Sequence, residues 1–123
     1  MSQMRKTIAL AAVATVLGWT AGGYAQENAP KGNAENGKSL FLKDGCYQCH
    51  GFGAQGASAT GPRLGPDPLP FDAFLRQLRQ PAQEMPSYEA AILTDQQAAD
   101  IHAYLGTIPK SPDWRTIPLL KDN

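Results

Sequence analysis

The chain has 123 residues, and its 11 basic and 11 acidic residues give a formal net charge of zero at pH 7. Without residues 1–25, nine basic and eleven acidic residues remain, a formal charge of −2, and the basic residues form no stripe. Nucleic acid is therefore not an expected partner. The length fits one small domain, which buries only a limited core from its own side chains.

Residues 1–25 have the composition of an export signal. Two basic residues precede an uncharged apolar run over residues 8–17, and small residues up to Ala25 approximate a cleavage site. The run is shorter than the roughly twenty residues that span a bilayer, although an uncleaved anchor is the alternative. We predict a signal peptide over 1–25 and a periplasmic domain over 26–123, without stable membrane insertion after cleavage.

Residues 34–43 have the pattern of a first helix. Leu40 and Phe41 lie among charged residues, and Gly37 precedes Phe41 by one turn on the same face. Because a glycine inside a helix costs about 1 kcal/mol relative to alanine, we expect a packing reason for it. Close approach of a second helix at Gly37 would supply that reason.

The stretch Cys46-Tyr47-Gln48-Cys49-His50 follows and determines most of the interpretation. Two cysteines separated by two residues and followed by histidine form the attachment pattern of a c-type haem. On one helical turn, positions i, i+3 and i+4 share a face, so Cys46, Cys49 and His50 are expected to point the same way. The two sulfurs could then bond to a porphyrin edge while the imidazole reaches the iron.

Three other kinds of site use cysteines at this spacing. A thioredoxin-like redox pair needs a βαβ unit, and no such pattern is present. A structural zinc site needs four ligands, and outside the signal only His102 could join the three motif residues. A disulfide between such close cysteines closes a loop too small to stabilise the fold much. Haem attachment is favoured, and it agrees with export because this motif is loaded outside the cytoplasm in the families that carry it.

Residues 51–61 form a loop of small residues that contains one misleading motif. Residues 51–56 match the G-x-G-x-x-G pattern of dinucleotide sites, and Asp72 lies about twenty residues from its start. No strand pattern precedes this motif, and the residue before it is the candidate haem histidine, so a dinucleotide site is not predicted. We expect these glycines to let the backbone pass close to a porphyrin.

The segment Thr60-Gly61-Pro62-Arg63-Leu64 comes next. A Pro62 carbonyl near His50 could accept a hydrogen bond from Nδ1–H and thereby determine the ring tautomer. An ordinary turn is an equal alternative from the spacing alone.

Residues 71–78 are predicted to form a short amphipathic helix. Apolar residues at 71, 74, 75 and 78 follow the i, i+3, i+4, i+7 pattern, with Asp72 in the first turn and Pro81 after the last. The apolar side chains are expected to face a core that a haem would largely fill.

Met85 is the single methionine that remains outside the signal. A thioether is a soft ligand suited to the second axial position of haem iron. A lone methionine more often fills a core. Met85 lies instead in a polar, proline-flanked stretch over residues 81–87, which favours ligation.

Thr94 to Gln97 form a capping-box pattern that begins a helix running to about Thr107. His102 borders the apolar face of this helix and is an alternative sixth ligand, although a partly exposed surface histidine is the simpler interpretation. The apolar face comprises Ala98, Ile101, Tyr104, Leu105 and Ile108.

Residues 109–123 are proline-rich and carry Trp114 and an apolar group over residues 117–120. This tail could pack back on the domain or dock to a partner, and the sequence leaves both possibilities open.

Residues 34–108 together resemble a class I monohaem cytochrome c. Cys46, Cys49 and His50 match the attachment motif of that family. The segment 61–64 resembles its G-P-x-L turn, and Met85-Pro86-x-Tyr88 resembles its distal ligand loop.

Two of the predicted helices strengthen this resemblance. Gly37 and Phe41 resemble the glycine and aromatic residue of the family's N-terminal helix, and Tyr104 and Leu105 resemble the C-terminal helix that crosses it. The tail after Ile108 departs from the minimal pattern of the family.

The resemblance implies a small all-α fold wrapped round one covalently bound haem c. Its cofactor-binding residues would be Cys46, Cys49, His50, Pro62 and Met85, with His50 and Met85 as the metal ligands. With both axial positions filled, the iron has no open position for a substrate. We therefore expect an electron carrier rather than an enzyme.

The expected function is periplasmic transfer of one electron between redox proteins, with a dehydrogenase as donor and an oxidase or reductase as acceptor. Such encounters are usually weak and transient. One alternative is the haem subunit of a periplasmic dehydrogenase complex, with the tail as a permanent interface. Another is a ligand-binding or peroxidase haem protein, which requires that Met85 not bind iron.

Overall fold

The computed structural model describes residues 29–120, so the predicted signal peptide and its cleavage site lie outside the described residues. Four α-helices and two short 3-10 helices occupy this part of the chain, and no strand occurs in it apart from an isolated bridge between Ala57 and Gly61. The predicted all-α fold is confirmed. The elements are α1 (Ala34–Lys43), α2 (Tyr47–His50), α3 (Phe71–Arg79), α4 (Asp95–Gly106), η1 (Trp114–Thr116) and η2 (Pro118–Leu120).

The first and last α-helices begin at side-chain caps. The Asn33 side chain accepts hydrogen bonds from the backbone N–H groups of Glu35 and Asn36 at the start of α1. Thr94 and Gln97 form a complete capping box at the start of α4, as the sequence predicts. These caps satisfy backbone donors that a helix leaves without partners in its first turn.

Helix α1 crosses α4 at Gly37, which confirms the packing expected for that glycine. A Cβ atom at Gly37 would lie 1.9 Å from the carbonyl oxygen of Asp100 in α4. One turn further along each helix, the rings of Phe41 and Tyr104 pack with their centroids 5.6 Å apart. Glycine is therefore required because the two backbones approach too closely for a side chain.

Asp100 ties the start of α1 to α4. Its carboxylate is buried and accepts hydrogen bonds from Asn33 N (2.8 Å), Asn36 Nδ2 (2.7 Å) and Gln96 Nε2 (3.0 Å). Burial raises the pKa of this carboxyl, but the three donors together outweigh burial and hold the pKa below its usual value. The helix crossing is thus held by polar contacts as well as by packing.

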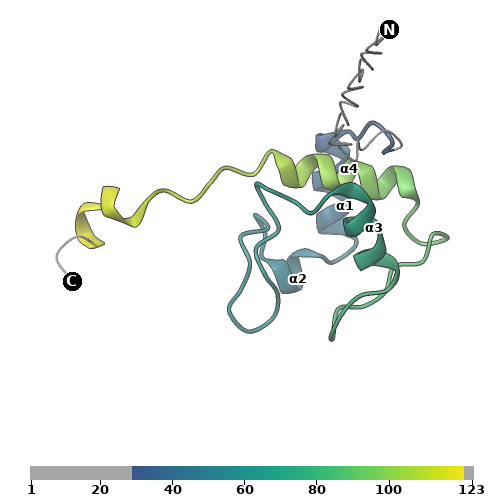
Figure 1. Cartoon of the computed structure of the whole chain (residues 1–123), viewed down its shortest axis with the longest axis horizontal. Coiled ribbons are helices and arrows are strands. Elements are labelled where there is room, and N and C mark those ends of the chain that lie inside the picture. The colour runs from purple at the N-terminus through teal and green to yellow at the C-terminus, as the bar shows by residue number, and fades with distance from the viewer. Residues whose placement is uncertain (1–28, 121–123) are drawn as a thin grey trace, which may run out of the picture.

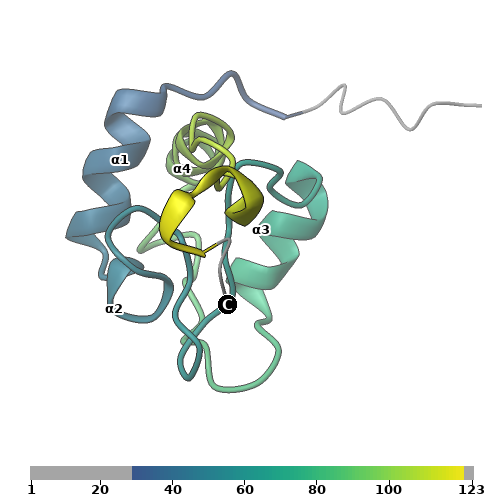
Figure 2. The same ribbon diagram turned by 90° about the vertical axis from the view of Figure 1, so that its left-hand side faces the viewer.

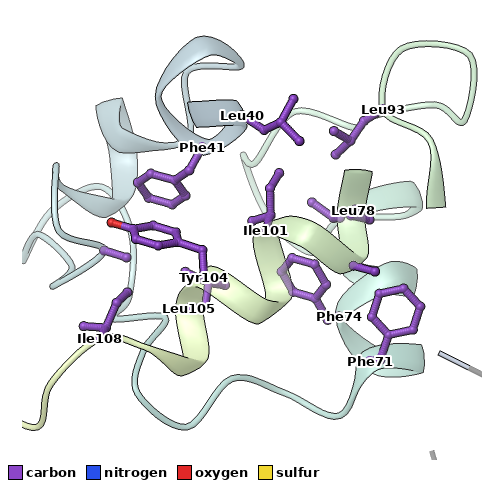
Figure 3. Close-up of a cluster of buried hydrophobic side chains, with 13 residues drawn as sticks. Leu40, Phe41, Phe71, Phe74, Leu78, Leu93, Ile101, Tyr104, Leu105 and Ile108 are labelled. Atoms are coloured by element: carbon purple, nitrogen blue, oxygen red, sulfur yellow. The ribbon is translucent and has the colours of Figure 1, made fainter. Parts of the chain in front are cut away.

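Helix α3 packs on the other side of α4 (Figures 2 and 3). It continues one residue beyond the predicted end, to Arg79, because Gln80 closes the last turn before Pro81. Side chains from α1 and α3 meet those of α4 in a single buried cluster. That cluster comprises Leu40, Phe41, Ala54, Phe71, Phe74, Leu78, Leu93, Ala98, Ala99, Ile101, Tyr104, Leu105 and Ile108.

The last described residues, 109–120, form an extension that we call the C-terminal arm. Figure 1 shows the arm leading away from the four α-helices. None of its residues is buried, and the exposed fractions of Trp114, Leu119 and Leu120 are 53%, 87% and 45%. In this structure the arm does not pack back on the domain.

Arg63 attaches the base of the arm to the loop that follows α2. Its guanidinium donates hydrogen bonds to the carbonyl oxygen of Pro109 (2.7 Å) and to Ser111 Oγ (3.1 Å). The arm therefore starts at a defined place beside this loop. Among residues 29–120, no helix has the length and apolar composition needed to cross a membrane.

Candidate functional site

The two cysteines and the adjacent histidine lie on one helical turn, as their spacing predicts. Cys46 has α-helical dihedral angles, and the backbone N–H of His50 donates to the Cys46 carbonyl oxygen at 3.0 Å. Both thiols are free and half-buried, whereas the His50 side chain is buried. Because i, i+3 and i+4 share a helix face, this turn presents two thiols and an imidazole on one side.

Glycines on either side delimit this turn. Gly45 and Gly51 have φ angles of 79° and 78°, in the left-handed region that glycine adopts without strain. Gly45 ends the run from α1, and Gly51 stops α2 directly after His50. The backbone N–H of Cys46 also donates to the Phe41 carbonyl oxygen at 3.1 Å, which joins the turn to α1.

The structure places the Pro62 carbonyl oxygen 2.8 Å from His50 Nδ1. With the proton on Nδ1, that nitrogen donates to the carbonyl, and the Nε2 lone pair is free to bind a metal. The Thr60 hydroxyl donates to the Cys49 carbonyl oxygen at 2.9 Å and holds the same loop against α2. Of the two interpretations left open for this segment, the structure supports a turn that orients the histidine.

Close packing at Gly61 explains part of this arrangement. A Cβ atom at Gly61 would lie 2.8 Å from the Cys49 carbonyl oxygen and 2.9 Å from His50 Nδ1. Only a residue without a side chain lets the loop approach the imidazole so closely. Pro62 follows directly and presents its carbonyl to the ring.

The environment of Cys46 does not suit a thiol–disulfide enzyme. Burial, and next the charge of Asp44, raise the pKa of the Cys46 thiol above its usual value. Reactive cysteines in redox enzymes have a lowered pKa, because the thiolate is the nucleophile. This observation argues against the thioredoxin-like interpretation, as does the lack of strands in residues 29–120.

A structural zinc site is also unsupported. Within the described part of the chain, no group of three or more His, Cys, Asp or Glu side chains has a geometry that could hold a metal ion. His102, the remaining candidate for such a site, points to α3 instead. Its Nε2 lies 2.8 Å from the Leu69 carbonyl oxygen, and its ring packs against Phe71 and Phe74 at centroid distances of 5.6 and 5.3 Å.

Met85 lies in the loop between α3 and α4 and is half-buried against the edge of the core. Its sulfur is 3.8 Å from Gln77 Nε2 on α3. Sequence reasoning missed Gln77, because a glutamine on the polar side of a short helix carries no signal of its own. The structure gives no direct contact between Met85 and His50.

Tyr88 connects the Met85 loop to the cysteine turn. Its hydroxyl donates to the Asp44 carbonyl oxygen at 2.9 Å, and its backbone N–H donates to the Leu78 carbonyl oxygen at 2.8 Å. Burial, and next the neighbouring Cys46 sulfur, raise the pKa of Tyr88 to about 12, so its hydroxyl stays protonated and can donate at neutral pH. One side chain thereby holds the methionine loop beside the first cysteine.

An open pocket of about 580 Å³ lies next to these residues. It is lined by residues 55–63, which include Pro62, and by Gln83 from the Met85 loop. Neither cysteine, His50 nor Met85 lines it, so the pocket alone identifies no ligand. It does show that the loop before α3 and the loop after it face a common opening.

These side chains fit a covalently bound haem. The turn offers two thiols on one face and an imidazole whose Nε2 is free, and a thioether lies on a loop tied to that turn. Partly buried apolar residues pack against the core, and a porphyrin that covered them would remove their exposed surface from water. They include Cys46, Tyr47, Leu64, Leu75, Met85 and Tyr88.

Comparison with known families identifies one match. A family model described as "Cytochrome C oxidase, cbb3-type, subunit III" matches residues 32–105, more than half of the chain. The matched segment contains both cysteines, His50, Pro62 and Met85, and it ends before the C-terminal arm. Neither the curated proteins nor the solved structures yielded a match.

Proposed function

Because the chain belongs to the cytochrome c family of cbb3-type oxidase subunit III, we propose that it carries single electrons between redox proteins in the periplasm. A cytochrome c domain binds haem c covalently and is an electron carrier rather than a catalyst. We assign attachment to Cys46 and Cys49 and axial ligation to His50 and Met85. The partners proposed are a dehydrogenase as donor and an oxidase or reductase as acceptor.

The observation that supports this assignment most is the hydrogen bond between His50 Nδ1 and the Pro62 carbonyl oxygen, at 2.8 Å. It selects the tautomer in which Nε2 can bind iron, and it makes the imidazole a stronger donor. Export through residues 1–25 remains part of the proposal, because those residues lie outside the described part of the chain.

A bound haem c would supply the ferrous–ferric couple that takes up and releases one electron. The two cysteines would hold the group by thioether bonds on one face of the α2 turn. His50 would be kept in orientation by Pro62, and Met85 would occupy the position that a substrate or small ligand would otherwise take. Methionine paired with histidine favours the reduced state and therefore a higher reduction potential.

Substitution of Met85 tests the assignment. In the ferric parent we expect the weak near-infrared band of sulfur-to-iron charge transfer, and in the ferrous parent we expect slow carbon monoxide uptake. Met85→Ala should abolish the band, lower the reduction potential and open the iron to carbon monoxide. Optical spectroscopy and redox titration measure all three properties.

His102→Ala is the matched control, because His102 is the alternative nitrogen ligand that the sequence offers for the second axial position. Since its ring contacts α3 and the Leu69 carbonyl, its removal should leave the three properties unchanged. Rapid carbon monoxide binding by the parent, or a spectral change caused by His102→Ala, would contradict ligation by Met85.

The C-terminal arm favours a second candidate function, the haem subunit of a larger complex. Trp114 and Leu119 are exposed in the isolated chain, as a segment reserved for a permanent interface would be. The matched family takes its name from an oxidase subunit, whereas the sequence suggested a dehydrogenase complex. Stable co-purification of a partner with the full chain, lost when residues 111–123 are deleted, would distinguish a subunit from a transient carrier.

A further inference from the structure

The side chain of Gln77 contacts the Met85 loop in two places. Its Nε2 lies 3.8 Å from the Met85 sulfur, and its Oε1 is 3.5 Å from the backbone nitrogen of Ala82. Gln77 is half-buried on α3, a helix whose other face is buried against α4 through Phe74 and Leu78. The Gln77 amide therefore extends from a packed helix and contacts the irregular loop that carries Met85.

The chemistry of the contact restricts what Gln77 can do. A thioether sulfur is a weak hydrogen-bond acceptor with two lone pairs, so it can accept from an N–H group and still offer one lone pair to a metal. The N–H dipole places its positive end at the sulfur. That orientation restrains the methionine side chain. If iron were bound to the sulfur, the N–H dipole would also disfavour the ferric state, which carries one more positive charge than the ferrous state.

We propose that Gln77 is a positioning residue for Met85, which donates a hydrogen bond to the thioether and thereby favours both its retention and the reduced state of the iron. This inference rests on the proposed function, because it requires Met85 to be the axial ligand. The backbone N–H of Ala82 donates to the oxygen of the same amide, which gives Gln77 a second contact with the loop. Gln77 thus selects one orientation of the thioether rather than merely filling space.

The test compares Gln77→Leu with Gln80→Leu in the haem-loaded, full-length protein. Gln80 is exposed at the end of the same helix, and its side chain has no hydrogen bond in this structure, so it is a matched control. Gln77→Leu should lower the reduction potential and should make ferric Met85 about two- to tenfold easier to displace by imidazole, since a neutral hydrogen bond contributes roughly that factor. Gln80→Leu should change neither property.

Gln77→Glu separates the sulfur contact from the contact with Ala82. A carboxylate keeps an oxygen that can accept from Ala82 N–H but has no N–H to donate to sulfur. The carboxylate charge lowers the reduction potential by itself, so displacement of ferric Met85 by imidazole is the readout for this variant. If the sulfur contact is what matters, Gln77→Glu should make Met85 about as easy to displace as Gln77→Leu does. Displacement of Met85 as difficult as in the parent in both Gln77 variants would overturn the inference.

The near-infrared band distinguishes failure of this inference from failure of the proposed function. The parent and Gln77→Leu should both keep the band, because the methionine is held less firmly but still bound. A parent that lacks the band overturns ligation by Met85 and this inference with it. A parent that has the band, with a Gln77→Leu potential equal to that of Gln80→Leu, overturns only the role of Gln77.

Discussion

At the scale of single residues, Asp100 shows how the domain uses a buried charge. Three donors satisfy its carboxylate at 2.7 to 3.0 Å, and they come from residues on both sides of the α1–α4 crossing. An ionised carboxylate excluded from water is costly unless such donors surround it. The three hydrogen bonds therefore offset the cost of burying the charge, and two of them connect α4 to the start of α1.

Asp100 should make the stability of the domain depend on pH. Its folded-state pKa is lower than the usual 3.8, so its contribution is fully present above the pKa of the unfolded chain and is lost as pH falls through the folded pKa. Asp100→Asn should destabilise the domain by about 1–3 kcal/mol at neutral pH, since hydrogen bonds to a charged group are replaced. Denaturant unfolding of both proteins from pH 2 to 7 measures the difference.

Comparison of the two proteins isolates Asp100 from the other titrating groups. The difference in unfolding free energy should be constant above about pH 5 and should shrink towards acid pH. A difference that does not vary with pH would mean that the Asp100 carboxylate is not what the three donors stabilise.

At the scale of elements, the crossing of α1 and α4 depends on the close approach of the two helices at Gly37. A Cβ atom at Gly37 would lie 1.9 Å from a carbonyl oxygen of α4, so even alanine must separate the helices. Gly37→Ala should destabilise the domain by about 1–3 kcal/mol, the usual range for overpacking. The midpoint of denaturant unfolding measures this loss.

Gly106→Ala is the control for this substitution. Gly106 is in α4, and apart from its chain neighbours and the nearby backbone of its own helix, no atom lies within 4 Å of the position its Cβ would take. Alanine there should leave stability unchanged or raise it by up to about 1 kcal/mol, the helix-propensity difference. Equal effects of the two alanines would show that helix propensity, not the crossing, governs Gly37.

The elements also show how much of this molecule could be predicted from its sequence. The cap at Thr94, the apolar stripe from Phe71 and the cysteine turn were predictable because each depends on residues a few positions apart. The contacts of Gln77 with Met85 and of Arg63 with Pro109 were not. Each contact depends on the path of an irregular segment, the loop after α3 for Met85 and the arm after α4 for Pro109. Polar side chains that make such contacts have no periodic pattern in the sequence.

At the scale of the whole molecule, a haem would complete the core. The buried cluster is bordered by apolar side chains that stay partly exposed, among them Leu64, Leu75 and Met85. A small domain buries a smaller share of the surface that its unfolded chain exposes than a large domain does. A covalently held porphyrin against these residues would bury more apolar surface in the folded state than the chain can bury by itself.

Covalent haem is therefore expected to be a condition for folding as well as for function. When the chain is expressed with the haem-attachment machinery, its intact mass should exceed that of the processed polypeptide by one haem. Substitution of both Cys46 and Cys49 by serine should remove this added mass and much of the helical signal in far-UV circular dichroism, because the apolar border of the core would be left in water. Substitution of either cysteine alone should leave a haem that is held by one thioether and a less stable fold. A parent whose mass equals the bare polypeptide, or a doubly substituted chain that keeps its full helical signal and unfolding midpoint, would contradict the role of haem as part of the core.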